Sequence, residues 1–304
     1  MEDYQSDYPL TYISLFSGIG GFEVGILKIF PNARCLGYSE IDPYAIKVYE
    51  DHFPNHANLG DVKKINGKKY RGKVDLLVGG SPCQNFSNLG DGKGLKGDKS
   101  RLLKEYIRIL KEIDPLFFIL ENVHMSQTHK DGVSKLIGAE PTPIDSNVIS
   151  LQRRKRLYWC NFDISRISSL PLMEGTLADV LLEQDDEHLD EVSWKDLNKR
   201  STGATEKYLK MILNGKPCER AKYFSVVYPS DKNSHTLTCC SSQEFVCMGK
   251  NIARQLHPIE RERLQTFPDN WTNAVSTTRR MSSLGNAVTC DVIALICSCI
   301  SPID

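Results

Sequence analysis

The sequence has no excess charge of either sign, no long apolar run and no paired cysteine motif. Its 304 residues carry 38 Lys and Arg against 38 Asp and Glu, so any contact with a polyanion must be local. The longest apolar stretch near the end, 292–300, is too short to span a bilayer, and the first residues do not resemble a signal peptide. We therefore expect a cytoplasmic protein with no membrane partner.

The ten cysteines are scattered and contain no C-x-x-C pair, and Cys239 and Cys240 are adjacent. This spacing argues against a disulfide framework and against a zinc site, so we expect reduced thiols and no metal. With 40% hydrophobic and 25% charged residues, the composition is that of a globular protein. Basic residues do gather at 153–156, 199–222 and 279–280, although a basic cluster alone is more often a solvated face than a phosphate site.

Short apolar runs alternate with helical patterns through the first 160 residues. This alternation predicts βαβ units and an α/β fold with a mainly parallel sheet. Strands are expected at 12–16, 34–38, 74–78, 116–120 and 157–161, and helices at 21–30, 43–52 and 100–113.

The pattern changes after residue 162. An acidic run at 183–191 is predicted to be a solvated linker, and the basic, turn-rich segment from about 194 to 249 predicts a second, smaller domain. Helical periodicity returns at 259–267. The last segment, 288–300, is too apolar to stand in water, so it should pack back onto the first domain as a helix or a strand–helix pair.

These boundaries divide the chain into three parts. Residues 1–185 and 284–304 form the main domain, 186–250 the second domain and 251–283 a connector.

A glycine-rich turn, Phe16-Ser17-Gly18-Ile19-Gly20-Gly21, lies between the first expected strand and helix. Glycines there let the backbone approach a nucleotide-like ligand, although a tight β–α turn explains them about as well. Glu40, at the end of the second strand, is placed to bind ribose hydroxyls, and Asp61 is placed to accept from an adenine amino group. Taken singly, each is more simply a surface carboxylate.

Cys83 follows Pro82 in a Gly/Pro-framed loop beyond the third strand, where open α/β sheets place their chemistry. It is a candidate nucleophile, against the alternative of a small structural residue. Glu121 follows the fourth strand and should emerge at the same sheet edge, where a carboxylate serves as an acid. The competing view is that Asn122 caps a helix and Glu121 is merely exposed. Arg154 and Arg156 precede the fifth strand and point to that edge, unless they are surface arginines.

Together these residues resemble the DNA cytosine-C5 methyltransferases over nearly the whole chain. The matching blocks, in family order, are 16–21; Glu40-Ile41-Asp42; Gly60-Asp61-Val62; Gly80-Ser81-Pro82-Cys83-Gln84; Glu121-Asn122-Val123; 152–156; 254–258 with Glu260, Gln265, Phe267 and Pro268; and Gly285-Asn286-Ala287-Val288. Each block is modest, but eight blocks in the right order make coincidence very unlikely. The resemblance implies a Rossmann-like class I methyltransferase sheet with a smaller target-recognition domain.

The resemblance also implies the reaction and its catalytic residues. Cys83 would add to C6 of a flipped-out cytosine in duplex DNA, and C5 would then take the methyl group of S-adenosylmethionine. Glu121 would hold the N3 and N4 edge of the base and supply a proton. Arg156 would bind O2, with Arg154 supporting the loop and the charge of the site.

The family pattern assigns the remaining site residues by position. For the cofactor they are Phe16, Ser17, Gly18, Ile19, Gly20, Gly21, Glu40, Ile41, Asp61, Pro82, Asn286, Ala287 and Val288. For DNA they are Gln84, Ser87, Thr236 and Leu237, with a mobile lid over the base at 85–97 and the recognition region at about 190–249. Two departures, Ser283 in place of a frequent glutamine and Thr289-Cys290 where proline is frequent, concern packing of the cofactor pocket.

Three rival interpretations remain at this point. A transfer-RNA methyltransferase shares the Pro-Cys chemistry, but its Cys-Phe-Thr signature is absent here. A catalytically silent DNA-binding homologue would not need every chemical residue. A nicotinamide-dependent oxidoreductase explains neither the Pro82-Cys83 pair nor the second domain. We expect a monomer that acts on double-stranded DNA, without an obligate protein partner. Its recognition sequence and any restriction partner are not derivable from the sequence.

Overall fold

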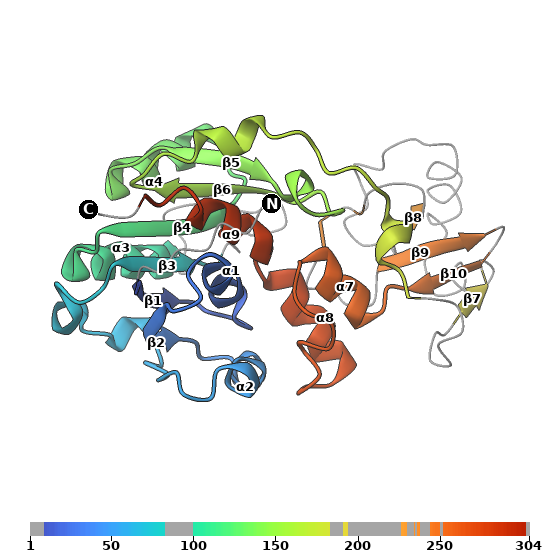
Figure 1. The fold of residues 1–304 in the computed structure, drawn as a ribbon, viewed down its shortest axis with the longest axis horizontal. Helices are drawn as coiled ribbons and strands as arrows, with labels where there is room; N and C mark the ends of the chain where they lie inside the picture. The colour runs from blue at the N-terminus through green and yellow to red at the C-terminus, as the bar shows by residue number, and fades with distance from the viewer. Residues whose placement is uncertain are drawn as a thin grey trace.

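The computed structural model describes residues 9–82, 100–182, 191–193, 226–229, 234, 236–237, 244–249 and 252–301. In these ranges the chain builds a six-stranded sheet and a four-stranded sheet, which Figure 1 shows at opposite ends of an elongated molecule. Among these described residues, no helix has the length and apolar character needed to cross a membrane.

The six-stranded sheet consists of β1 (Thr11–Leu15), β2 (Arg34–Ser39), β3 (Leu76–Gly80), β4 (Phe117–Val123), β5 (Pro141–Asp145) and β6 (Lys155–Cys160). The four-stranded sheet consists of β7 (Glu191–Ser193), β8 (Val226–Pro229), β9 (Glu244–Gly249) and β10 (Ile252–Gln255). The α-helices are α1 (Gly21–Ile29), α2 (Pro43–His52), α3 (Ser100–Ile113), α4 (Gln127–Ile137), α7 (Pro258–Leu264), α8 (Thr277–Asn286) and α9 (Cys290–Cys297). The 3-10 helices are η1 (Val62–Lys64), η2 (Gly67–Tyr70), η4 (Ser146–Val148), η5 (Ser165–Ser169) and η6 (Leu177–Val180).

The larger sheet has the order β2-β1-β3-β4-β6-β5, and its strands are parallel except for β6, which runs antiparallel to both neighbours. The prediction of an α/β fold with a mainly parallel sheet is therefore confirmed. From β1 the chain goes to β2 on one side and later to β3 on the other. In open α/β sheets ligands bind beyond the carboxyl ends of the strands at such a switch point.

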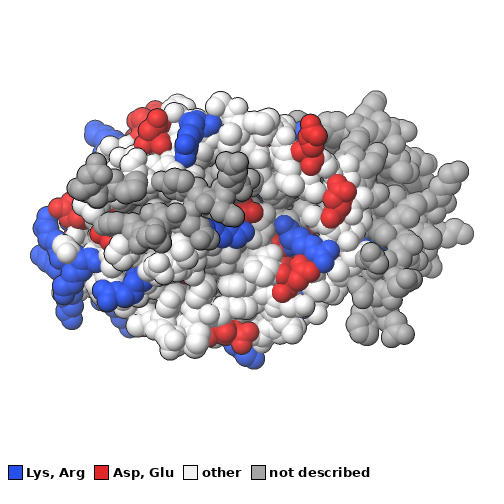
Figure 2. Space-filling model, in the orientation of Figure 1, with Lys and Arg blue, Asp and Glu red and all other residues white. Residues whose placement is uncertain are grey.

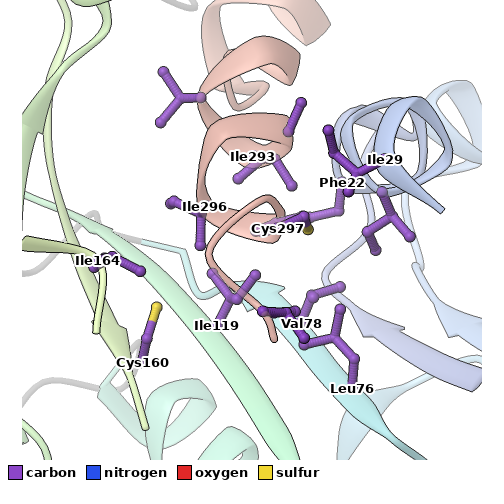
Figure 3. Packing of buried hydrophobic residues seen from close by; sticks show 14 of the residues in the cluster. Phe22, Ile29, Leu76, Val78, Ile119, Cys160, Ile164, Ile293, Ile296 and Cys297 are labelled. Atoms are coloured by element: carbon purple, nitrogen blue, oxygen red, sulfur yellow. The ribbon is translucent and has the colours of Figure 1, made fainter. Parts of the chain in front are cut away.

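Helices cover both faces of this sheet because alternate strand residues point to opposite sides. On one face Tyr12, Val78 and Ile119 pack against α1 and α9 (Figure 3). On the other face Ile13 and Leu77 pack against α3 and α4. The result is a three-layer arrangement whose buried core holds the strand ends in place.

The apolar C-terminal segment packs onto the larger sheet, as the sequence predicts. It forms the helix α9, whose Ile293 and Ile296 point into the core beside α1 (Figure 3). Gly25 permits this close approach, because a Cβ there would lie 2.6 Å from the Cys290 carbonyl oxygen. Helix α9 begins two residues later than the predicted segment and ends three residues earlier.

Several expected elements differ in extent. Strand β4 continues through Val123, so Glu121 lies inside the strand and not after it. Strand β6 begins at Lys155, which likewise places Arg156 inside a strand. Strand β3 extends through Gly80, and α7 ends at Leu264 instead of continuing to 267. The sequence did not predict α4, β5 or α8.

The smaller sheet has the order β7-β10-β9-β8 and is joined to the rest through α7 and η6. Figure 1 shows α7 and α8 between the two sheets. Leu237 and Val246 from the smaller part share a buried cluster with Leu151, Leu256 and Leu264. This packing holds Leu237 and Val246 against the loop that leads into β6.

Candidate active site and cofactor cavity

A cavity of about 320 Å³ opens beyond the carboxyl ends of β1 and β3, at the switch point of the larger sheet. This volume lies within the range of small-molecule sites in proteins. Of the predicted residues, the cavity is lined by Phe16, Ser17, Gly18, Ile19, Gly21, Glu40, Pro82, Glu121, Arg154, Arg156, Asn286, Ala287 and Val288. The cavity thus brings together residues from both ends of the sequence. Some of them were predicted to bind a cofactor and others to act on a substrate.

The turn after β1 takes a backbone shape that favours glycine. Gly18 and Gly20 have φ values of 56° and 90°, and Phe16 also lies in the left-handed region at 56°. A Cβ on Gly21 would lie 2.8 Å from Val288 Cγ2, so this glycine lets the start of α1 approach the segment before α9. The turn is therefore shaped for close approach of backbone to its neighbours.

Glu40 joins the first two β–α turns. Its Oε2 accepts a hydrogen bond from the Gly18 amide at 2.9 Å, and its Oε1 accepts from the amides of Ile41 and Asp42 at 2.7 and 2.9 Å. Asp42 in turn caps α2 by accepting from the Tyr44 amide, with Pro43 in the first turn. The carboxylate of Glu40 is held at the cavity wall with lone pairs remaining for a ligand hydroxyl.

Three predicted cofactor residues lie outside the lining of this cavity. Ile41 is 68% exposed. Asp61 caps η1 by accepting from the Lys63 amide at 3.0 Å, and the preceding Gly60 is bound to β2 through Ser39. Gly20 faces the Phe53 ring. The structure therefore places Ile41 and Asp61 at the same sheet edge as Glu40 but does not bring them into the enclosed space.

Glu121 and Arg156 form an ion pair on neighbouring antiparallel strands. Arg156 Nε lies 3.1 Å from Glu121 Oε1, and the two side chains are 14% and 12% exposed. A Cβ on Gly80, the strand neighbour of Glu121, would lie 2.9 Å from Glu121 Oε2, so glycine there leaves room for the carboxylate. This geometry gathers an acid and a guanidinium at the cavity.

Burial raises the pKa of Glu121, and the positive charges of Arg156 and Arg154 lower it by less. A buried carboxyl with a raised pKa retains its proton at higher pH than an exposed one. Such a group is suited to donate a proton to a bound base. The pair thus combines a proton donor with a fixed positive charge.

Arg154 lies in the wall of the cavity and is almost fully buried. Its guanidinium donates to the carbonyl oxygens of Leu237, Gly285 and Ala287, at 3.1, 3.1 and 2.8 Å. The alternative that Arg154 is a surface arginine is therefore wrong.

Asn122 was not predicted as a site residue, and the alternative that it caps a helix is wrong. It lies in β4, is buried, and its Nδ2 donates to Ser81 Oγ at 2.9 Å. It therefore anchors the Ser81-Pro82 segment that leads to Cys83. A polar residue inside an otherwise apolar strand is the signal that points to such a contact.

Not all predicted residues fall within the described ranges. Cys83, Gln84, Ser87 and the whole of 85–97 lie in the stretch 83–99, outside the described residues. Thr236 and Leu237 are described: Thr236 Oγ1 donates to the Arg153 carbonyl, and Leu237 is buried. The roles assigned to these residues stay predictions.

Basic side chains also gather away from the cavity. Lys63, Lys64, Lys68, Lys69 and Arg71 are all exposed on and beside η1 and η2. Figure 2 shows basic residues concentrated at the end of the molecule where Figure 1 draws this segment. Sequence reasoning did not single out this group, although five basic residues within nine positions were visible.

Comparisons with known proteins identify the family of the chain. The chain matches the family described as C-5 cytosine-specific DNA methylase over residues 10–138 and 150–301. It is 31% identical to the type II methyltransferase M1.ScrFI of Lactococcus lactis subsp. cremoris, over 93% of this chain and 76% of that protein. It is 28% identical to the type II methyltransferase M.HhaI of Haemophilus parahaemolyticus, over 94% and 93%.

One relative is matched over only part of its length. The chain is 35% identical to the orphan methyltransferase M.SPRI of Bacillus phage SPR over 67% of this chain, and it spans 50% of that protein. A solved structure of a putative DNA modification methyltransferase from an E. coli prophage shares the fold, with a TM-score of 0.66 at 23% identity over 95% of this chain and 97% of that one. The Entamoeba histolytica methyltransferase EhMeth shares it with a TM-score of 0.69 at 18% identity, over 95% and 96%.

The fold predicted from the motifs, that of the class I methyltransferases, is confirmed by these structures. The chain belongs to the C-5 cytosine-specific DNA methylase family, and the prediction of a DNA (cytosine-5)-methyltransferase is confirmed at the level of that family.

Proposed function

We propose that this chain methylates C5 of a flipped-out cytosine in duplex DNA, with S-adenosylmethionine as methyl donor and Cys83 as nucleophile. The observation that carries the proposal is the single cavity lined both by the glycine-rich turn with Glu40 and by the Glu121–Arg156 pair. A methyl donor and a base bound there would be neighbours.

The cavity fits the cofactor. Its turn has a left-handed backbone at Gly18, and Glu40, which accepts from the Gly18 amide, offers a carboxylate to which ribose hydroxyls can donate. Asn286, Ala287 and Val288 also line the cavity. When bound, S-adenosylmethionine supplies an electrophilic methyl group.

The residues of the chain would make C5 of the base nucleophilic, so that it can accept the methyl group. The Cys83 thiolate adds to C6, the carboxyl of Glu121 donates a proton to N3, and the electron pair of the C5–C6 bond becomes available at C5. Arg156 would bind O2 and hold Glu121 in place. After C5 is methylated, the C5 proton passes to solvent, the Cys83 thiolate leaves C6 and N3 returns its proton to Glu121. These losses restore the aromatic ring, the thiolate and the carboxyl.

The base must leave the duplex for this chemistry, at a cost of about a few kcal/mol. We propose that the part of the chain that contains the four-stranded sheet reads the bases that flank the flipped cytosine. The direct role of Leu237 is then to position this recognition segment, because its side chain is buried. We infer that the protein acts as a monomer on double-stranded DNA in the cytoplasm.

Bisulfite sequencing of duplex DNA treated with the purified protein and S-adenosylmethionine tests this function. We expect 5-methylcytosine at one short recurring sequence, and none with Cys83→Ser. Cys299→Ser is the matched control: it replaces a half-buried thiol whose contacts, to Arg166 and to the Leu295 carbonyl, a hydroxyl can reproduce. Unmodified DNA together with methylated transfer RNA would contradict the proposal in favour of an RNA enzyme.

A further inference from the structure

The loop before β6 joins the recognition segment to the cofactor wall. The Ser234 amide donates to the Leu151 carbonyl at 2.9 Å, and the Arg153 amide donates back to the Ser234 carbonyl at 2.8 Å. The Leu237 amide donates to Gln152 Oε1 at 3.2 Å. The chain from 234 to 237 is therefore attached to 151–153 through successive hydrogen bonds.

Arg154 extends this attachment into the cavity. One nitrogen of its guanidinium, Nη1, donates to the Leu237 carbonyl, and the other, Nη2, donates to the carbonyls of Gly285 and Ala287. A guanidinium is planar and its donors have fixed directions. Because both sets of acceptors are met by one rigid group, a shift of Leu237 must move Arg154 or break one of these bonds.

The carbonyl acceptors belong to the wall of the cofactor cavity. Gly285 and Ala287 line it beside Asn286. A second brace holds the same wall through bonds that do not include Leu237: Gln265 Nε2 donates to the carbonyls of Leu284 and Ala287, and Gln265 Oε1 accepts from Thr289 Oγ1. The wall therefore has one support from Gln265 and one, Arg154, that also bonds to Leu237 in the recognition segment.

We propose that Arg154 is a positioning residue that couples DNA binding to cofactor binding. This inference rests on the proposed function, in which the cavity holds S-adenosylmethionine and the smaller part reads DNA. DNA held by the recognition segment restrains Leu237, and Arg154 passes this restraint to Gly285 and Ala287. The cofactor then binds a wall that is already in place, and by linkage it favours DNA binding by the same factor.

Lysine at this position would keep the charge but not the coupling. An ammonium on a flexible stem is a point donor and cannot hold carbonyls on opposite sides at fixed angles. Arg154→Lys is therefore expected to keep the positive charge and to lose the coupling between DNA binding and cofactor binding. Thr289→Val is the matched control, since it removes a bond of the second brace and leaves the contacts of Arg154 unchanged.

The experiment measures the dissociation constant of S-adenosylhomocysteine, with and without a saturating duplex that contains the methylated site. For the wild type we expect binding at least about fivefold tighter with DNA, within the usual range of coupling between sites. For Arg154→Lys we expect the ratio to fall below about twofold. For Thr289→Val we expect weaker binding in both conditions and a ratio at the wild-type value.

The inference would be overturned if DNA did not change the dissociation constant in the wild type, or if Arg154→Lys kept the wild-type ratio of the two constants. It would also be overturned if Thr289→Val lowered this ratio as much as Arg154→Lys does. Thermal unfolding checks that each variant is folded. If Arg154→Lys does not fold, Thr236→Val takes its place, because it removes the bond to the Arg153 carbonyl and loosens the recognition segment beside Leu237. A reduced ratio is again expected, and a wild-type ratio would contradict the proposal. Failure of the wild type to bind S-adenosylhomocysteine or DNA would instead contradict the proposed function.

Discussion

Replacing Glu23 by glutamine should change how the stability of the protein depends on pH. Glu23 lies in the first turn of α1, just after the glycine-rich turn, and is fully buried. Its Oε1 accepts from the Tyr49 hydroxyl at 3.0 Å, and that hydroxyl is also 3.0 Å from His56 Nδ1. Burial raises the pKa of Glu23 to about 7, and the hydrogen bond from Tyr49 offsets only part of that effect.

The direction of the pH effect follows from this raised pKa. Between about pH 4.5 and pH 7 the folded protein keeps the proton of Glu23, whereas the unfolded chain releases it. The stability that Glu23 contributes is thus complete below pH 4.5 and is lost as the pH rises to 7. A difference of about 2.5 between the two pKa values corresponds to about 3 kcal/mol.

Glutamine has no proton to lose, and its oxygen can still accept from Tyr49. Relative to the wild type, Glu23→Gln should therefore gain about 3 kcal/mol of unfolding free energy between pH 4.5 and pH 8. Urea unfolding across this range measures the difference. Glu50→Gln is the control, because Glu50 accepts from Tyr38 at 2.9 Å but is exposed. A constant difference between wild type and Glu23→Gln at every pH would refute the reasoning.

Three other substitutions test the site and its support. Glu121→Gln should lower kcat at least about 100-fold, the lower limit for loss of a general acid, in radiolabelled methyl transfer; a fall of less than tenfold would remove this carboxyl from proton transfer. Gly25→Ala should lower the unfolding free energy by about 1–2 kcal/mol, because crowding against α9 exceeds the gain in helix propensity; a stabilised variant in urea unfolding would contradict this. Asn122→Ala should lower kcat, since it releases the Ser81 anchor of the segment that leads to Cys83, and an unchanged kcat would show that this anchor is dispensable.

Strong local signals allowed parts of the fold to be predicted from the sequence. Helix α2 has the predicted bounds because Asp42 and Pro43 form a recognisable start. Helix α3 also has the predicted bounds, because its apolar residues repeat at helical spacing. The edge strand β5 escaped prediction because Pro141 and Pro143 argue against a central strand, although proline is tolerated at the edge of a sheet, where β5 lies.

Some residues of the site could be placed from the sequence, whereas others could not. The glycine-rich turn and Glu40 follow strands, so their place could be derived from chain order. The extension of β4 through Glu121 could not, because it depends on pairing with Tyr158 of the antiparallel strand β6. The contacts of Arg154 with Leu237 and Ala287 join segments more than 80 residues apart, and no local pattern encodes them.

The most direct test of the account is to trap the protein on duplex DNA that carries 5-fluorocytosine at its methylated position. Fluorine at C5 cannot leave as a proton does, so the bond between Cys83 and C6 should persist in the presence of S-adenosylmethionine. Mass spectrometry of the digested complex should find the nucleotide on the peptide that contains Cys83, and none in Cys83→Ser. A wild-type protein that methylates DNA without forming this adduct, or an adduct on another residue, would contradict the central claim.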